Sequence, residues 1–322
     1  MKTAVVIPCY RVRRHIEGVL AGIGPDVDRI FVVDDCCPEG TGRFVEETVK
    51  DPRVRVIVHQ ENRGVGGAMV TGYRSALEDG AEIVVKLDGD GQMDPALIPQ
   101  LTAPLRQRTA DYAKGNRFFH PDYLLRMPKL RVLGNTLLSF ANKLISGYWD
   151  LMDPANGFTA IHRTALRLVP LGKIDERYFF ESDMLFRLNV ARAVVVDMPM
   201  QAVYADEQSN LRVRRVLCVF PWQYLNRFAK RVFFNYFLRD FNLGTLALVF
   251  GLPLVVFGTT FGLYHWITAH FSGTQATAGT VMVAALPVIV GFQLLLFFLQ
   301  FDILSVPKRP LSANDPQKPS AA

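Results

Sequence analysis

Cysteine is scarce in this chain and follows neither a metal-binding nor a disulfide pattern. The 322 residues include four cysteines: Cys9, Cys36, Cys37 and Cys218. Their spacing fits neither a zinc site nor a framework of paired bridges. Cys36 and Cys37 are adjacent, which is typical of a strand end or a turn. The sequence therefore favours a reducing cytoplasm.

The beginning of the chain lacks two further signals. The opening run Ala4-Val5-Val6-Ile7-Pro8 is strand-like and lacks the longer apolar core of a signal peptide, so we expect that the first domain is not exported. The first strand also lacks the glycine fingerprint of dinucleotide-binding folds, which disfavours a dehydrogenase.

Acidic and basic side chains are missing from two late segments, residues 243–267 and 279–301, each of which could cross a bilayer. The loop 268–278 contains no Lys or Arg, whereas Arg239 and Lys308 flank the pair. The positive-inside rule then places both flanks in the cytoplasm. We expect a multi-pass protein of the inner (cytoplasmic) membrane with both termini cytoplasmic. A buried helical hairpin of a soluble protein is the alternative.

The formal net charge is +6, and basic residues crowd between Arg212 and Arg239, directly before the apolar segments. This placement favours a lipid bilayer as partner and not nucleic acid. Apolar and aromatic positions such as Phe220, Tyr224 and Phe228 recur there at helical spacing, with basic residues between them. Residues 216–242 are therefore expected to form amphipathic helices on the membrane face.

The first half of the chain alternates short apolar runs with segments of helical period. Strands are expected near residues 3–7, 29–33, 54–58 and 83–87, and helices near 15–22, 42–50 and 66–79. Such alternation predicts an α/β fold with a largely parallel sheet and helices on both faces. Ligands bind beyond the carboxyl ends of the strands in such sheets.

Asp88 and Asp90 follow the fourth of these runs, with Gly89 between them. Residues at i and i+2 of a strand end project to one side, so the two carboxylates could present hard oxygens to one Mg²⁺ or Mn²⁺. Mg²⁺ usually bridges substrate phosphates, which favours a diphosphate-bearing substrate. An acidic turn without a metal is the alternative.

Polar residues also follow the second and third strands. Asp34 and Asp35 could accept hydrogen bonds from a ribose or a base, or could cap a helix or form an Asx turn. The segment from Asn62 to Gly67 begins a helix with small residues that could approach a phosphate, although helix-to-sheet packing explains its glycines equally well.

Five motifs occur in order along the chain: Val6-Ile7-Pro8-Cys9-Tyr10, Val32-Val33-Asp34-Asp35, Glu61-Asn62-Arg63-Gly64-Val65-Gly66, Leu87-Asp88-Gly89-Asp90-Gly91-Gln92 and Gly115-Asn116-Arg117. Together they resemble family 2 glycosyltransferases. The chain is most similar to the branch of dolichol-phosphate mannose synthases and bacterial polyprenyl-phosphate glycosyltransferases. The resemblance covers roughly residues 3 to 215.

This resemblance implies a GT-A (Rossmann-like) fold, a nucleotide-sugar donor, a divalent metal, Mg²⁺ or Mn²⁺, and inversion at the anomeric carbon. The implied donor-binding residues are Pro8, Tyr10, Asp34, Asp35, Asn62 and Gly64. Asp88 and Asp90 would hold the metal, Gln92 would lie beside them and Arg117 would neutralise phosphate charge. Arg11-Val12 and Cys36-Cys37 depart from the family pattern, which leaves the base, UDP or GDP, open.

The acceptor-side candidates come from three later segments. Asp153 and Gly157 match the family's Asp-x-x-x-Gly-Phe signature, where the carboxylate faces the acceptor; an Asp-Pro turn is the alternative. Glu181 and Asp183 are weaker candidates, or first-turn residues favoured by the helix dipole. The linker candidates for binding an acceptor phosphate, or else for lying beside anionic headgroups, are Ser209, Arg212, Arg214 and Arg215.

The expected architecture is a cytoplasmic GT-A domain (1–215), amphipathic helices (216–242), two transmembrane helices (243–267 and 279–301) joined by a non-cytoplasmic loop (268–278), and a cytoplasmic tail (302–322). The expected reaction moves a hexose from a nucleotide-diphosphate sugar to polyprenyl phosphate for cell-envelope glycan or glycoprotein modification. Transfer to another lipid-linked or nascent glycan, and a catalytically silent nucleotide-sugar-binding membrane protein, are the alternatives. The sugar, the lipid length and a homo-oligomeric state stay open.

Overall fold

The computed structural model describes residues 1–119, 129–154, 156–200 and 213–314. The chain forms two compact units. The first contains residues 1–228 and the segment from Pro307 onward, and the second contains Ala229–Val306. Because the first unit includes both ends of the chain, the second unit is an insertion within it.

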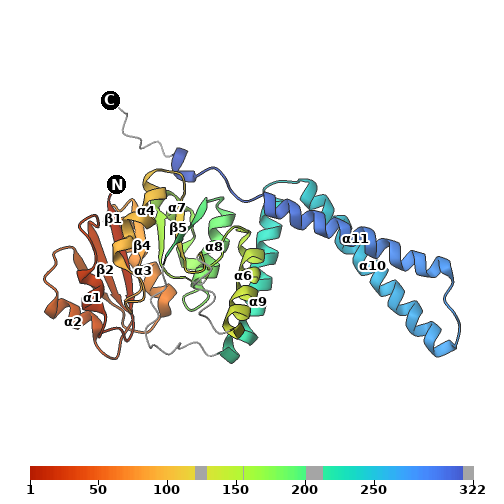
Figure 1. The fold of residues 1–322 in the computed structure, drawn as a ribbon, viewed down its shortest axis with the longest axis horizontal. Helices are drawn as coiled ribbons and strands as arrows, with labels where there is room; N and C mark the ends of the chain where they lie inside the picture. The colour runs from red at the N-terminus through yellow and green to blue at the C-terminus, as the bar shows by residue number, and fades with distance from the viewer. Residues whose placement is uncertain (120–128, 155, 201–212, 315–322) are drawn as a thin grey trace. The chain divides into compact units, whose positions relative to one another are not determined.

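The first unit is built on a seven-stranded mixed sheet with the order β3-β2-β1-β4-β6-β5-β7. Figure 1 shows this sheet with helices beside it. Its strands are β1 Thr3–Cys9, β2 Arg29–Asp34, β3 Val54–Val58, β4 Ile83–Lys86, β5 Tyr112–Asn116, β6 Thr159–His162 and β7 Val195–Pro199. Only β6 runs antiparallel to its neighbours. The predicted α/β class with a largely parallel sheet is confirmed, and β5 to β7 extend it beyond the four expected strands.

Helices cover both faces of this sheet. The helices of the first unit are α1 Ile16–Ala21, α2 Thr41–Thr48, α3 Gly64–Glu78, α4 Ile98–Arg106, α6 Lys129–Ser146, α7 Arg163–Leu168, α8 Phe180–Val190 and the greater part of α9 Val213–Phe233, with short 3₁₀ turns η1 Pro95–Leu97, η2 Leu171–Lys173 and η4 Leu311–Asn314. Val5 and Ile7 of β1 pack with α1 and α4 in one apolar cluster. On the other face α3 lies close to β1, because a Cβ on Gly72 would lie 2.1 Å from Val6 Cγ1.

The second unit contains the end of α9, a π-helical turn η3 Phe234–Leu238 and the long helices α10 Leu243–Ser272 and α11 Ala278–Leu304. Both long helices are long and apolar enough to cross a membrane. Glycines let them approach each other, since a Cβ on Gly291 would lie 2.8 Å from the Gly251 carbonyl oxygen. Because α10 ends at Ser272 and α11 begins at Ala278, the expected loop 268–278 is partly helical.

An ion pair closes the base of this hairpin. The guanidinium of Arg231 in α9 donates to both carboxylate oxygens of Asp302 near the end of α11, at 2.6 and 2.9 Å. Tyr236 donates to the same carboxylate at 2.7 Å. Both charged side chains are almost completely buried, so each supplies the counter-charge that the other needs.

The chain returns from the hairpin to the first unit through η4. The carboxylate of Asp111, which is 0% exposed, accepts hydrogen bonds from the backbone N–H groups of Val194, Leu311 and Ser312 at 2.8 to 2.9 Å. One buried side chain therefore joins the start of β5, the residue before β7 and the returning tail.

We predict that Asp111→Ala lowers the free energy of unfolding by at least about 2 kcal/mol, because three backbone amides lose their acceptor. Denaturant unfolding of the detergent-solubilised chain measures this. The matched control is Asp94→Ala, since exposed Asp94 accepts one local amide, from Ala96 at 2.9 Å, and should cost about 1 kcal/mol or less. Equal losses in the two variants would contradict the role given to Asp111.

Candidate active site

The predicted carboxylate pair lies directly after β4, at the carboxyl end of the parallel strands. The Oδ1 atom of Asp88 accepts a hydrogen bond from Lys86 Nζ at 2.6 Å. Asp90 Oδ1 accepts the backbone N–H of Gln92 at 3.0 Å. Gly91 has a φ of 77°, a left-handed conformation that glycine adopts readily and that turns the backbone between Asp90 and Gln92.

This pair fits a divalent cation of the Mg²⁺ or Mn²⁺ type. Within the described ranges, no group of three or more His, Cys, Asp or Glu side chains gathers as a metal cage. Two hard carboxylates at a strand end instead suit a cation that completes its coordination with water and substrate phosphates. Asp88 and Asp90 would be the protein ligands.

Lys86 is a charged residue of the site that the sequence analysis missed. Its side chain is 1% exposed, and its ammonium lies 2.6 Å from Asp88 and 3.5 Å from Glu181 Oε1. Burial opposes the charged form, but Asp88 and Glu181 outweigh it and raise the pKa of Lys86 above its ordinary value. The signal was a lysine within an otherwise apolar, buried strand, since lysine is almost never fully buried without a partner.

Arg117 and Asp153 form a second charged pair, after β5. Arg117 Nε donates to Asp153 Oδ2 at 2.7 Å, and its terminal nitrogen donates to Oδ1 at 3.0 Å. Asp153 is 1% exposed, whereas the Arg117 side chain is 30% exposed. A bidentate pair of this kind fixes the guanidinium plane, so Asp153 sets the orientation of Arg117.

Gly157, in the loop between α6 and β6, packs against Lys86 and Asp88. A Cβ on Gly157 would lie 2.3 Å from Lys86 Nζ and 2.5 Å from Asp88 Oδ2, so a larger residue there would displace these two side chains. Below this loop, Lys114 Nζ donates to the backbone oxygen of Asn156. Burial lowers the pKa of Lys114 to about 8, although Asp153 opposes the change.

Asp197 at the end of β7 is a further titratable group beside the loop. Its Oδ2 atom accepts the Met152 backbone N–H at 3.0 Å and the Asn116 side-chain amide at 2.9 Å. Burial raises the pKa of Asp197 to about 6.

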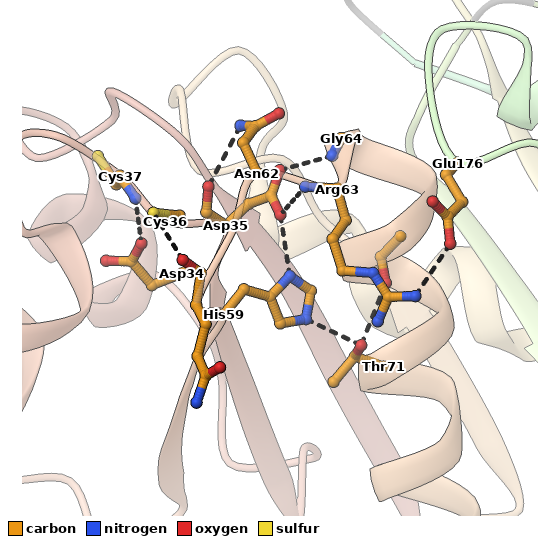
Figure 2. A network of polar contacts seen from close by, with 12 residues as sticks. Asp34, Asp35, Cys36, Cys37, His59, Asn62, Arg63, Gly64, Thr71 and Glu176 are labelled. Atoms are coloured by element: carbon orange, nitrogen blue, oxygen red, sulfur yellow. Dashed lines mark hydrogen bonds and ion pairs between the residues drawn. The ribbon is translucent and has the colours of Figure 1, made fainter.

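The carboxylates of Asp34 and Asp35 accept backbone N–H groups near the starts of two helices; Figure 2 shows the contacts of Asp35 with Arg63 and Gly64. Asp34 accepts the backbone N–H groups of Cys37 and Gly42 at 2.6 and 2.5 Å. Asp35 accepts those of Arg63 and Gly64 at 2.8 and 2.7 Å, and His59 Nδ1 lies 2.9 Å from it. Both are 3% exposed. The N-cap residues are Gly40 for α2 and Arg63 for α3, so Asp34 and Asp35 are not N-caps but bind the helix starts from the end of β2. A donor contact by either carboxylate stays a prediction.

The other donor-side candidates surround this network. Tyr10 is 43% exposed, and Asn62 donates to the Asp35 backbone oxygen at 3.2 Å. Pro8 is half-buried at the end of β1. A Cβ on Gly64 would lie 2.5 Å from the Glu176 backbone oxygen, and one on Gly66 would lie 2.2 Å from that of Asp175. The glycines at the start of α3 therefore accommodate the loop before α8.

The acceptor-side candidates separate into different environments. Glu181 faces Lys86, whereas Asp183 is 0% exposed and accepts hydrogen bonds from Arg187 and Arg227 at 3.0 and 2.5 Å. Those contacts give Asp183 a structural part in joining α8 to α9. Ser209 and Arg212 lie outside the described residues. Arg214 and Arg215 belong to α9, but their side chains are also outside the described part.

Comparisons with known proteins agree with this geometry. The model of Glycosyl transferase family 2 matches residues 4–169. The UDP-N-acetylglucosamine–dolichyl-phosphate N-acetylglucosaminyltransferase of Methanococcus voltae is 28% identical over 216 residues, covering 63% of this chain and 86% of the relative. The undecaprenyl-phosphate mannosyltransferase of Micrococcus luteus is 30% identical over 211 residues, covering 63% and 84%.

A solved structure shares the fold. The glucosyl-3-phosphoglycerate synthase of Mycobacterium tuberculosis, crystallised with Mn²⁺, UDP and glucosyl-3-phosphoglycerate, aligns with a TM-score of 0.52 at 20% identity. The alignment covers 71% of this chain and 79% of that one. The predicted GT-A fold is therefore confirmed.

We predict that Gly157→Ala destabilises the chain by about 1–3 kcal/mol, because the added methyl group overlaps Lys86 and Asp88 in a packed interior. Thermal unfolding without ligand measures the effect. Gly18→Ala in α1 is the matched control, since a Cβ there meets nothing within 4 Å. If both variants unfold at the wild-type temperature, the loop does not pack on the pair as described.

Proposed function

The chain belongs to glycosyl transferase family 2, and from that membership we propose that it transfers a hexose from a nucleotide-diphosphate sugar to polyprenyl phosphate. The observation that carries the proposal is the placement of Asp88 and Asp90 after β4 and of the Arg117–Asp153 pair after β5. Because β4 and β5 both run antiparallel to β6, their carboxyl ends meet at one edge of the sheet.

The donor diphosphate would bind at this edge. Asp88 and Asp90 would hold the divalent cation, with Gln92 beside them. When bound, the cation supplies positive charge that stabilises the departing nucleoside diphosphate. Arg117 would place a second positive charge beside the phosphates. Because Asp153 already fixes its guanidinium, Arg117 would not need to reorient during the reaction.

The acceptor is proposed from the relatives and from the membrane segments. Both relatives described above carry names of enzymes that act on polyprenyl-type phosphates. The helices α10 and α11 would anchor the chain in the bilayer where such a lipid resides, with both termini on the cytoplasmic side. Ser209, Arg212, Arg214 and Arg215 are proposed to bind its phosphate.

The transfer itself exchanges two bonds at the anomeric carbon. An oxygen of the lipid phosphate forms a bond to this carbon as the bond to the diphosphate oxygen breaks, and the leaving nucleoside diphosphate keeps the electron pair. Attack from the opposite side inverts the anomeric centre. A phosphate monoester has its second pKa at about 6, so the attacking oxygen is already ionised at neutral pH.

This acceptor makes a general base unnecessary. Both oxygens of Asp153 bind Arg117, which suits a carboxylate that orients an arginine and does not remove a proton. The acceptor phosphate and the donor diphosphate are both negatively charged and repel each other. The rate should therefore depend more on the cationic groups that offset this repulsion than on proton transfer.

We predict that Asp90→Ala removes most of the turnover, because the contribution of a catalytic metal is worth several kcal/mol. The test incubates the purified chain with Mg²⁺ or Mn²⁺, polyprenyl phosphate and a panel of nucleotide sugars, and identifies the lipid product by mass. Asp94→Ala, in the same loop, should keep turnover. Near-normal turnover of Asp90→Ala with EDTA present would refute the metal assignment, and no product with any donor would refute the proposed reaction.

We also predict that Asp153→Asn lowers turnover without abolishing the acid limb of the pH–rate profile, which should follow ionisation of the acceptor phosphate near about pH 6. The profile is measured for both forms with saturating metal. Since the pKa of Asp197 is raised to about 6, Asp197→Asn tests whether that residue causes the limb. A limb lost only in Asp153→Asn would make Asp153 the base.

A further inference from the structure

Lys86 lies where the donor and acceptor sides of the site meet. Its ammonium is 2.6 Å from Asp88 Oδ1 and 3.5 Å from Glu181 Oε1. Asp88 follows β4, whereas Glu181 is in the first turn of α8. Gly157 covers the ammonium from a third segment. One buried cation thus joins three segments that are distant in the sequence.

The position of Lys86 affects how strongly the carboxylates can bind a metal. Its ammonium occupies one oxygen of Asp88, so that oxygen is already engaged by a positive charge. It also places a positive charge next to the site proposed for a divalent cation. Like charges separated by a few ångströms in a partly buried site repel strongly. Glu181 partly offsets this repulsion, because it brings a negative charge to the same ammonium.

We propose that Lys86 is a positioning residue that weakens metal binding while no donor is bound, and so couples metal binding to donor binding. The inference rests on the proposed function, because it assumes a metal at Asp88 and Asp90. A donor diphosphate brings negative charges that attract both the cation and Lys86. The metal is then held firmly only when the nucleotide is present. When the nucleotide is absent, the ion pair with Lys86 keeps Asp88 in place.

The opposite charges of Lys86 and Glu181 give this proposal a signature that loss of structure would not produce. Removing the ammonium in Lys86→Met should tighten binding of Mn²⁺ alone by about tenfold, since a repulsive charge is lost. Removing the carboxylate in Glu181→Gln should weaken it by several-fold. The double variant should return close to the wild-type affinity.

Lys2→Met is the matched control for the lysine substitution. Lys2 Nζ also pairs with a carboxylate, Asp79 Oδ2 at 2.7 Å, but at the amino end of β1, the opposite edge of the sheet from Asp88. The same change of side chain there should leave the Mn²⁺ affinity unchanged.

The experiment titrates full-length, detergent-solubilised variants with Mn²⁺ and measures free Mn²⁺ by electron paramagnetic resonance, first alone and then with UDP or GDP. Nucleotide should tighten Mn²⁺ binding more in the wild type than in Lys86→Met. Thermal unfolding shows that each variant is folded, and Glu181→Gln tests the proposal even if Lys86→Met does not fold.

Two outcomes separate this proposal from the proposed function. Unchanged or weaker Mn²⁺ binding by folded Lys86→Met, or unchanged binding by Glu181→Gln, overturns the role of Lys86 alone. If the wild type binds no Mn²⁺ with or without nucleotide, the metal assignment of the proposed function fails first. Opposite shifts in the two single variants, cancelled in the double variant, establish the coupling.

Discussion

The site depends on one constraint, which is that a buried charge needs an opposite charge beside it. Lys86, Asp153 and Asp183 are each at most 1% exposed. Each has at least one partner from another segment, so pairing these charges also fixes tertiary contacts: β4 to α8, the end of β5 to the loop before β6, and α8 to α9. The geometry offered to a substrate is thus largely a consequence of charge pairing behind it.

Features set by local pattern could be predicted from the sequence. The short apolar runs became β1, β2 and β4 because strands buried on both faces need nearly continuous apolar residues. The third run became β3, the end strand of the sheet, which is only partly buried. The Asp88–Asp90 pair followed from the end of one such run, since residues beyond a parallel strand end lie at the ligand-binding edge. The expected membrane spans, residues 243–267 and 279–301, fall within α10 and α11, because an apolar run of more than about twenty residues without charges has few other stable conformations.

Features that depend on distant partners could not be predicted. Glu181 and Asp183 are two residues apart on one helix, yet Lys86 faces the first and Arg187 and Arg227 bind the second. The sequence gives no means of distinguishing them, because their partners lie up to about a hundred residues away along the chain. The return of the tail to Asp111 was missed for the same reason, since backbone amides make that contact and leave no side-chain pattern.

The two departures from the family pattern, at Arg11 and at Cys36-Cys37, prove to be in contact. The backbone N–H of Arg11 donates to Cys37 Sγ at 3.0 Å, and Arg11 and Cys36 both have left-handed backbones, with φ of 59° and 54°. Such conformations in residues other than glycine carry a cost of about 1–3 kcal/mol each, and they persist only where surrounding contacts enforce them. The Arg11 guanidinium also lies 5.4 Å from the centre of the Tyr10 ring. The loops after β1 and β2, where the chain departs from the family pattern, are therefore joined directly by the hydrogen bond from the Arg11 amide to Cys37 Sγ.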